Sequence, residues 1–340
     1  IVPAQLRVLV TVRPRFACPK GRAGVVQAPP PPRLIEGGLP TEAFLAWLVV
    51  SKYADALPLY RIAQILARSG VEIDRSTLAD WVGRTAFHLK PVVQHMLGHL
   101  RRSTKLFMDE TTAPVLDPGR GRTKTGYLWA LARDDRGWSG DDPPGVVFTY
   151  APGRAGQNAE QILQGFDGIL QLDGYPGYDR LTRPSRKGGA PITVAHCWAH
   201  ARRKFKEAQA VQSKDKTGKA DQALAYIQKL YAIEKHIKDE PPDKRFEVRK
   251  QEAKPILEKL KAWMEKSLQT VPPKTAIGKA LVYLHNQWGR LISYIEDGHY
   301  PIDNNAAERV IRPFTIGRKN WMFSKSQAGA KASANLYSLI

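Results

Sequence analysis

Five short apolar runs between residues 104 and 200 restrict the folds that this chain can adopt. Their length and composition suit β-strands, and turn clusters rich in Gly and Pro separate the first three. The runs are residues 105–109, 127–132, 146–150, 169–173 and 192–195. A helical stretch at residues 156–165 precedes the fourth run. Three strands joined by hairpins, then a helix and further strands, predict an α/β fold: a mixed sheet with flanking helices.

Residues 41–100 carry apolar side chains at the i, i+3, i+4 spacing that is typical of helices. Thr41 is well placed to cap a first helix, because its hydroxyl can accept a hydrogen bond from the first turn. Pro58 separates this helix from a second one, which is predicted at residues 59–68.

A turn at residues 69–74 separates the second helix from a third at 77–84, which we expect Ser76 to cap. A helix, a Gly-containing turn and a capped helix form the helix-turn-helix pattern. In that motif the start of the second helix enters the major groove of DNA, so Arg75, Ser76 and Thr77 would face the bases. A plain helical hairpin within a core is the alternative.

The segment before these helices is different in character. Residues 1–27 alternate apolar and polar side chains as a strand does, and the proline run within residues 28–40 predicts a stiff linker. Because residue 1 is Ile and the final residues stop within a helical pattern, we expect the chain to be an internal part of a longer protein.

The chain is strongly basic, with 52 Lys and Arg against 32 Asp and Glu, a formal net charge of +20. Such a surplus favours a polyanionic partner, with nucleic acid ahead of an acidic membrane surface. A hydrophobic share of 43% excludes global disorder. No apolar run reaches the roughly 18 residues of a membrane-spanning helix. Two cysteines cannot build a disulfide scaffold, so a reducing compartment fits.

Two acids stand at the ends of strands that are predicted to be buried: Asp109 closes one and Asp173 closes another. A charge there costs free energy unless it is paired or holds a metal ion. Two carboxylates on neighbouring strands repel each other, and Mg²⁺ or Mn²⁺ relieves that repulsion because these ions prefer oxygen ligands. A pair of such ions can hold the reacting oxygens of a phosphodiester in line. The alternative is that each Asp begins a turn.

A third acid, Glu308, lies on a short helix that Asp303 is placed to cap and Pro313 is placed to end. The polar residues that share one face of this helix are Asn304, Asn305, Glu308 and Arg312. Two Asn residues are weak helix formers, so a polar stripe facing a metal site explains them better than an ordinary surface ion pair within the helix.

Five blocks of the sequence are distinctive: Met108–Thr111, Leu172–Tyr175, Cys197–Phe205, Asp303–Pro313 and Gly317–Trp321. In these blocks the chain resembles the insertion sequence 66 family of bacterial DDE transposases. Residues 25–84 also resemble the family's helix-turn-helix segment. The block at 303–313 is long and specific, and the resemblance covers nearly the whole chain.

The resemblance implies an RNase H-like catalytic core with a helical insertion before the last acid. It carries the catalytic and metal-binding triad onto Asp109, Asp173 and Glu308, with two Mg²⁺ (or Mn²⁺) ions as cofactors. In the family's reaction, water frees a 3′-OH at the element end, and that 3′-OH then attacks a target phosphodiester. The expected partners are double-stranded DNA, further copies of the chain on paired ends and accessory proteins of the element. The expected location is the bacterial cytoplasm, at the nucleoid.

These observations divide the chain into six predicted segments. They are a zinc-finger-like remnant (1–27), a Pro-rich linker (28–40), a helix-turn-helix DNA-binding domain (41–100), the first part of the catalytic core (101–201), a charged helical insertion (202–300) and the C-terminal part of the core with the last acid (301–340). The family begins with a cysteine-rich segment, but Cys18 alone cannot hold zinc and Gly21 stands where a second ligand would fall. We therefore expect no bound zinc.

Basic residues along the resembling blocks are candidates for DNA contact, together with one tryptophan. They are Arg202, Arg203, Lys204, Arg309, Arg312, Arg318, Lys319 and Trp321. The cations would bind the phosphate backbone, while Trp321 would either stack on an unpaired base or pack in the core. We expect Cys197 and His200 to have a structural role beside the active site, because a metal site would need further ligands nearby.

Other functions stay open at this point. A catalytically inactive DNA-binding relic or regulator would bind DNA with strong salt dependence and would not cut it. A structure-specific nuclease on the same core would cut without joining. An RNA-binding scaffold is the weakest alternative, because the sequence has no aromatic RNA-binding motif.

Overall fold

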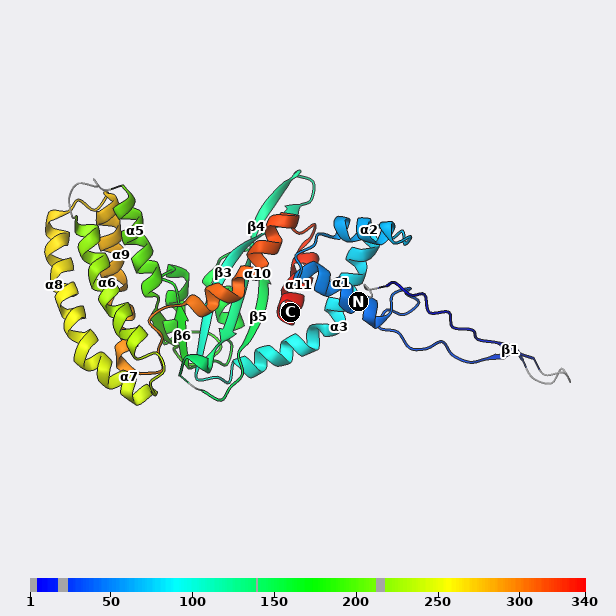
Figure 1. Cartoon of the computed structure of the whole chain (residues 1–340), viewed down its shortest axis with the longest axis horizontal. Coiled ribbons are helices and arrows are strands. Elements are labelled where there is room, and N and C mark those ends of the chain that lie inside the picture. The colour runs from blue at the N-terminus through cyan, green and yellow to red at the C-terminus, as the bar shows by residue number, and fades with distance from the viewer. Residues whose placement is uncertain (1–4, 18–23, 139, 212–217) are drawn as a thin grey trace. The chain divides into compact units, whose positions relative to one another are not determined.

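The computed structural model describes residues 5–17, 24–138, 140–211 and 218–340 (Figure 1). The chain forms two compact units. One reaches to residue 90 and includes residue 340, and the other comprises residues 91–339. The expectation that Cys18 holds no zinc concerns a residue outside the described ranges. No helix within those ranges has the length and apolar character needed to span a lipid bilayer.

Three helices dominate the first unit. They are α1 (Glu42–Tyr53), α2 (Leu59–Arg68) and α3 (Arg75–Leu100), whose last turns belong to the second unit. Thr41 caps α1 as predicted, since its hydroxyl accepts a hydrogen bond from the Phe44 N–H at 3.3 Å. The second helix has the predicted bounds, and its apolar face buries Ile62 and Leu66.

The third helix differs from its prediction at both ends. It begins at Arg75, and the Asp74 carboxylate accepts the Ser76 N–H at 2.7 Å, so the predicted Ser76 cap is wrong. A carboxylate suits this position because it also faces the positive end of the helix dipole. The helix then continues past its predicted end to Leu100, since later positions such as Val93 stay buried at helical spacing.

The strand-like pattern of the N-terminal segment does not produce a strand at residues 6–12. Only β1 (Arg15–Phe16) and β2 (Val26–Gln27) pair, in antiparallel fashion. Val8 and Val12 are 87% and 82% exposed. An alternation of apolar and polar side chains gives a stable strand only where a partner strand and an apolar surface are available. For residues 6–12, the described residues of this segment provide neither.

The second unit contains a five-stranded mixed sheet, as the sequence predicted (Figure 1). Its strands are β3 (Lys105–Asp117), β4 (Arg122–Arg133), β5 (Gly145–Ala151), β6 (Ile169–Leu172) and β7 (Thr193–His196). Their order across the sheet is β5-β4-β3-β6-β7. β3, β4 and β5 form an antiparallel meander, whereas β6 and β7 add in parallel on the other side of β3. The crossover to β6 contains α4 (Gly156–Ile162).

Two C-terminal helices cover the meander: α10 (Asn305–Trp321) contacts β3 and β4, and α11 (Gln327–Tyr337) contacts β5. The predicted helix end at Pro313 is wrong, because α10 continues through it. A proline inside a helix costs about 3 kcal/mol. Ile311 and Phe314 flank it and are buried, and burial of each such side chain contributes about 1.5–3 kcal/mol. Burial of these side chains therefore offsets the proline.

A helical segment, termed the insertion, follows β7 and precedes α10. Its elements are α5 (Trp198–Ala210), α6 (Lys219–His236), α7 (Pro242–Val248), the π-helical turn η3 (Arg249–Ala253), α8 (Lys254–Thr270), α9 (Ala276–Ile292) and the 3₁₀ turn η4 (Ser293–Glu296). The insertion has an apolar interior, in which Ile227, Leu230 and Leu260 are fully buried. α9 contacts both α5 and β7, which attaches the insertion to the edge of the sheet.

Candidate active site

Asp109 of β3 and Asp173, which directly follows β6, stand just beyond the point where the parallel pairing of these two strands stops. The last registered pair is Phe107 with Gln171, and each Asp stands two residues further along. Residues two apart on a strand point to the same face, and Phe107 packs against α10 on that face. One correction follows: Asp109 does not close its strand, because β3 continues to Asp117 paired with β4 alone.

Glu308 reaches the same region from α10. Alanines in the first turn of this helix pack against Phe107. The residue before the helix, Asn304, donates its side-chain amide to the Met108 carbonyl at 3.0 Å. The helix start is therefore anchored next to Asp109. The charge of Glu308 acts on Asp109, so the third acid lies within electrostatic reach of the first.

The pKa of Asp109 is raised from 3.8 to about 7, and burial is the largest cause. The negative charges of Glu110 and Asp173 contribute to this rise, and that of Glu308 contributes less. A hydrogen bond from the Glu110 N–H to the Asp109 carboxylate, at 2.9 Å, acts in the opposite direction. A carboxyl group in this setting keeps a proton near neutral pH unless a cation takes the proton's place.

Glu110, Arg154 and Tyr178 form a network beside the first acid that the sequence analysis missed. The Glu110 carboxylate, only 1% exposed, accepts hydrogen bonds from the Arg154 guanidinium and the Tyr178 hydroxyl. Arg154 Nη2 also lies 3.7 Å from the Asp173 carboxylate. The guanidinium stacks on the Tyr175 ring, 3.8 Å from its centroid. One cation therefore links two carboxylates of the site.

α5 supplies the groups that contact Glu308. Arg203 Nη2 lies 3.3 Å from the Glu308 carboxylate, and His200 Nε2 lies 3.7 Å from it. Burial lowers the pKa of His200, and the negative charges of Asp173 and Glu308 oppose that change. In the described structure Glu308 thus pairs with a residue of the insertion, while Arg312 of its own helix is exposed.

Cys197 has a structural position next to these groups. Its sulfur accepts the Asn304 N–H at 3.1 Å, just before α10 begins. Burial raises the pKa of this thiol to about 12. Metals bind the thiolate and not the thiol, so a cysteine in this environment is a poor metal ligand. The geometry agrees with the structural role that we expected for Cys197.

The polar stripe predicted on α10 needs correction. Asn304 is fully buried, and both its backbone N–H and its side-chain amide bond to the protein core. The Asn305 amide donates to the Asp303 carboxylate at 2.8 Å. Asp303 also accepts the Asn305 N–H at 3.1 Å, but the residue that caps α10 is Asn304, so the predicted Asp303 cap is wrong. These two asparagines therefore build the start of the helix, while Glu308 and Arg312 lie further along it.

The three predicted acids do not form a compact metal cage. In the part of the chain that the structure describes, no three Asp, Glu, His or Cys side chains come close enough together to hold one metal ion. Asp109, Asp173 and Glu308 share one region, and the charges of the other two raise the pKa of Asp109. The Asp173 and Glu308 carboxylates are paired with Arg154 and Arg203, respectively.

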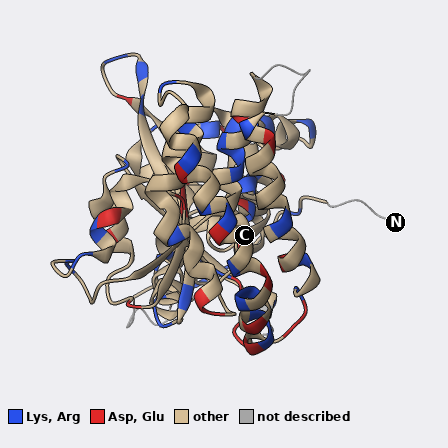
Figure 2. Ribbon diagram, turned by 90° about the vertical axis from the view of Figure 1, so that its left-hand side faces the viewer, with Lys and Arg blue, Asp and Glu red and all other residues tan. Residues whose placement is uncertain are grey.

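Most of the predicted DNA-contacting residues are exposed to solvent. The exposed ones are Arg75, Ser76 and Thr77 in the first unit and Arg202, Arg203, Lys204, Arg309, Arg312 and Lys319 in the second. Arg318 instead donates to the Thr112 hydroxyl of β3 at 2.7 Å. Trp321 packs against Tyr337, with ring centroids 6.4 Å apart. Lys and Arg are spread over many elements of the chain (Figure 2).

Known sequences place this chain in a family. The pattern described as Transposase IS66 family matches residues 37–332. Two uncharacterized proteins of Sinorhizobium fredii, y4qI and y4jD, are each 40% identical to the chain over its whole length, and a third, y4hP, is 31% identical. The chain spans 63%, 66% and 62% of these three proteins, respectively. Because the match covers most of its residues, the chain belongs to the IS66 family of transposases.

Proposed function

We propose that this chain carries the catalytic centre of a DDE transposase. The enzyme would cut DNA at the ends of its insertion sequence and join the freed 3′-OH to a target phosphodiester. The observation that carries the proposal is the meeting of Asp109, Asp173 and Glu308, from β3, the end of β6 and α10, on one face of the sheet. Asp109 and its neighbours would otherwise be a costly concentration of buried negative charge.

The strand order supports an RNase H-like core. An antiparallel meander followed by two parallel strands on the free side of the first strand is the expected arrangement for that fold. Sites in open sheets of this kind form at the carboxyl ends of parallel strands, and Asp173 directly follows β6. The insertion between Asp173 and Glu308 agrees with the family resemblance.

The chemistry of the donors suits Mg²⁺ or Mn²⁺, which are hard ions that prefer oxygen ligands. Asp109 and Asp173 would supply oxygens from adjacent strands, and Glu308 would supply one from α10. Two such ions, when bound, hold the attacking and leaving oxygens of a phosphodiester and neutralise the charge that develops there.

The other residues of the site would position these acids. Arg154 holds Asp173 and Glu110 in fixed orientations, and Asn304 fixes the start of α10 on β3. Arg203 and His200 hold the Glu308 carboxylate in the absence of metal. Such supporting contacts matter because catalytic groups must stay close to their productive geometry.

We further propose that double-stranded DNA is the main partner. The exposed start of α3, with Arg75, Ser76 and Thr77, would read base edges as the second helix of a helix-turn-helix motif. The exposed cations of α5 and α10 would contact phosphates and fix the register of the strand without reading bases. Joining two element ends also implies further copies of the chain and accessory proteins of the element.

A DNA-binding protein without cleavage activity is the second candidate. One observation favours it: the Glu308 carboxylate is engaged by Arg203 and His200. Such a protein would keep the positive charge and the exposed helix start, and it would bind DNA with strong salt dependence.

Supercoiled plasmid incubated with Mg²⁺ or Mn²⁺ separates the two candidates. We expect metal-dependent nicking by the wild type and none by Asp109→Asn. Asp173→Asn should also abolish cleavage, while its DNA affinity stays equal or rises because a negative charge near the phosphates is removed. Tight, salt-sensitive binding without metal-dependent nicking by the wild type would support the second candidate.

A further inference from the structure

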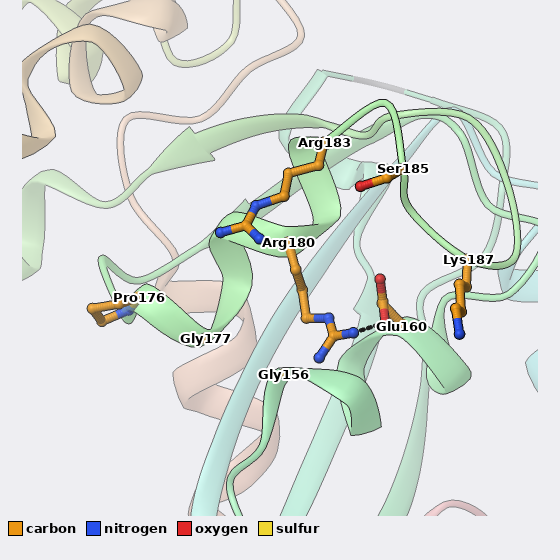
Figure 3. A pocket seen from close by; sticks show the side chains of 8 residues that line it. All are labelled: Gly156, Glu160, Pro176, Gly177, Arg180, Arg183, Ser185 and Lys187. Atoms are coloured by element: carbon orange, nitrogen blue, oxygen red, sulfur yellow. Dashed lines mark ion pairs between the residues drawn. The ribbon is translucent and has the colours of Figure 1, made fainter.

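A polar pocket of about 380 Å³ lies outside the carboxylate cluster (Figure 3). Its walls come from α4, the 3₁₀ helix η2 (Pro176–Thr182) and the loop at residues 183–187. The polar side chains that line it are Glu160, Arg180, Arg183, Ser185 and Lys187. This volume falls in the range of sites that hold small ligands or parts of larger ones.

The pocket has an excess of positive charge. Arg180 lies 2.7 Å from the Glu160 carboxylate, which is 7% exposed, so these two charges cancel. Arg183 and Lys187 then leave a formal charge of +2 at the pocket. Both side chains are exposed, and the described structure gives neither a carboxylate partner. Arg180 Nε is also buried without a hydrogen-bond partner among the described residues.

The loop that presents these cations is fixed from inside. The buried Arg186 guanidinium donates hydrogen bonds to three backbone carbonyls, at distances between 2.5 and 2.7 Å. Arg183 and Lys187 lie on opposite sides of the Arg180–Glu160 pair, and Ser185 lies above that pair, so all five side chains line one pocket (Figure 3). A loop anchored in this way loses less conformational entropy when its side chains bind a ligand.

η2 connects the pocket to the proposed catalytic acids. It begins three residues after Asp173, and its buried Tyr178 donates to Glu110. A Cβ atom at Gly156 would collide with the Gly177 carbonyl oxygen, so α4 rests directly on η2. A group held in the pocket would thus be separated from the catalytic carboxylates by a single short helix.

We propose that this pocket binds a phosphate group through Arg183, Lys187 and Ser185. A guanidinium, an ammonium and a hydroxyl are hydrogen-bond donors, and a phosphate offers only acceptors and negative charge at neutral pH. The source of the phosphate rests on the proposed function: a DNA phosphodiester close to the point of cleavage. Its capture outside the metal site would fix the register in which the strand enters that site.

The test uses the double variant R183Q/K187Q and a matched control, K259Q/K266Q, in the full chain. The control removes two charges from exposed positions on α8, outside the pocket. The first arm measures thermal stabilisation by inorganic phosphate against chloride at equal ionic strength. The second arm measures the affinity for duplex DNA across a salt series without divalent ions, so it needs no cleavage.

We expect R183Q/K187Q to lose the phosphate-specific stabilisation and the control to keep it. The DNA affinity of R183Q/K187Q should fall roughly three- to tenfold at low salt. The slope of log affinity against log salt concentration should become less steep by about one, the value of one lost phosphate contact. Loss of the phosphate response with unchanged DNA binding would support the phosphate site and assign it to free phosphate. Equal behaviour of the two variants in both arms would overturn the proposal. If the chain binds DNA but never nicks it, the proposed catalytic function is refuted. The phosphate-site proposal is still tested, because neither arm measures cleavage.

Discussion

Replacing Asp109 by Asn should stabilise the metal-free protein above neutral pH. The pKa of Asp109 is about 7 in the folded chain and 3.8 without its surroundings. At about 1.4 kcal/mol per unit, this difference amounts to roughly 4 kcal/mol. The folded state binds the proton more tightly than the unfolded state does, so Asp109 destabilises the fold progressively as the pH rises from about 4 to 7. Asn keeps the acceptor for the Glu110 N–H and cannot ionise.

Urea denaturation in the presence of a chelator measures this effect between pH 4 and pH 9. The gap in unfolding free energy between Asp109→Asn and the wild type should be absent near pH 4 and reach its full size above pH 7. Asp239→Asn, at an exposed position of the insertion, should show no such gap. Added Mg²⁺ should narrow the gap by stabilising the wild type alone. A gap that does not change with pH would refute the argument.

Three further changes test the contacts around the site. Arg154→Gln leaves the buried Glu110 carboxylate without its cation, so urea denaturation at pH 7 should show a loss of about 2–4 kcal/mol; a loss below about 0.5 kcal/mol would contradict this. Asn304→Ala removes the buried hydrogen bond between the start of α10 and β3. In the same assay it should lower the free energy of unfolding by about 1–3 kcal/mol. An unchanged stability would show that other contacts fix the helix start. Replacing Arg75 and Thr77 by Ala should weaken binding to the element end more than binding to random DNA, as measured by titration. Equal loss of affinity for both would show that the start of α3 contacts the DNA backbone and does not read bases.

The sheet was predictable from sequence because its strands are short, apolar and bounded by turn residues. All five predicted runs are strands, although β3 and β4 extend beyond them to the hairpin at Asp117–Arg122. The extension carries polar residues such as Thr112 and Lys124, whose pairing is set by the partner strand and not by their own apolar pattern. Local signals therefore located the strands but not their full length.

Helix ends were harder to predict, because packing on other elements decides them. Pro313 is a strong local signal for a helix end, yet α10 continues through it to remain on the sheet. Ser76 is a good capping residue by composition, but α3 begins at Arg75, and Asp74 directly before it accepts the Ser76 N–H. The error at Pro313 comes from giving local propensity more weight than tertiary contacts, which routinely override it, whereas at Ser76 a second local capping residue was overlooked.

The candidate site was only partly predictable for a different reason. Asp109 and Asp173 are marked by their places at the ends of apolar runs and Glu308 by the polar residues around it, whereas the family resemblance was needed to join the three acids into one site. Glu110 gave no comparable signal, because its partners Arg154 and Tyr178 lie 44 and 68 residues away in the sequence. Only the paired strands and the following turn bring these groups together.

The most direct test of the central claim compares plasmid nicking by Glu308→Gln and Glu258→Gln with that of the wild type, in Mg²⁺ and in Mn²⁺. Glu308 is the acid that α10 contributes to the proposed metal site, whereas Glu258 is an exposed acid on α8. The account predicts metal-dependent nicking by the wild type and by Glu258→Gln, and none above background by Glu308→Gln, with DNA binding retained in all three. Metal-dependent nicking by Glu308→Gln at the wild-type rate would contradict it.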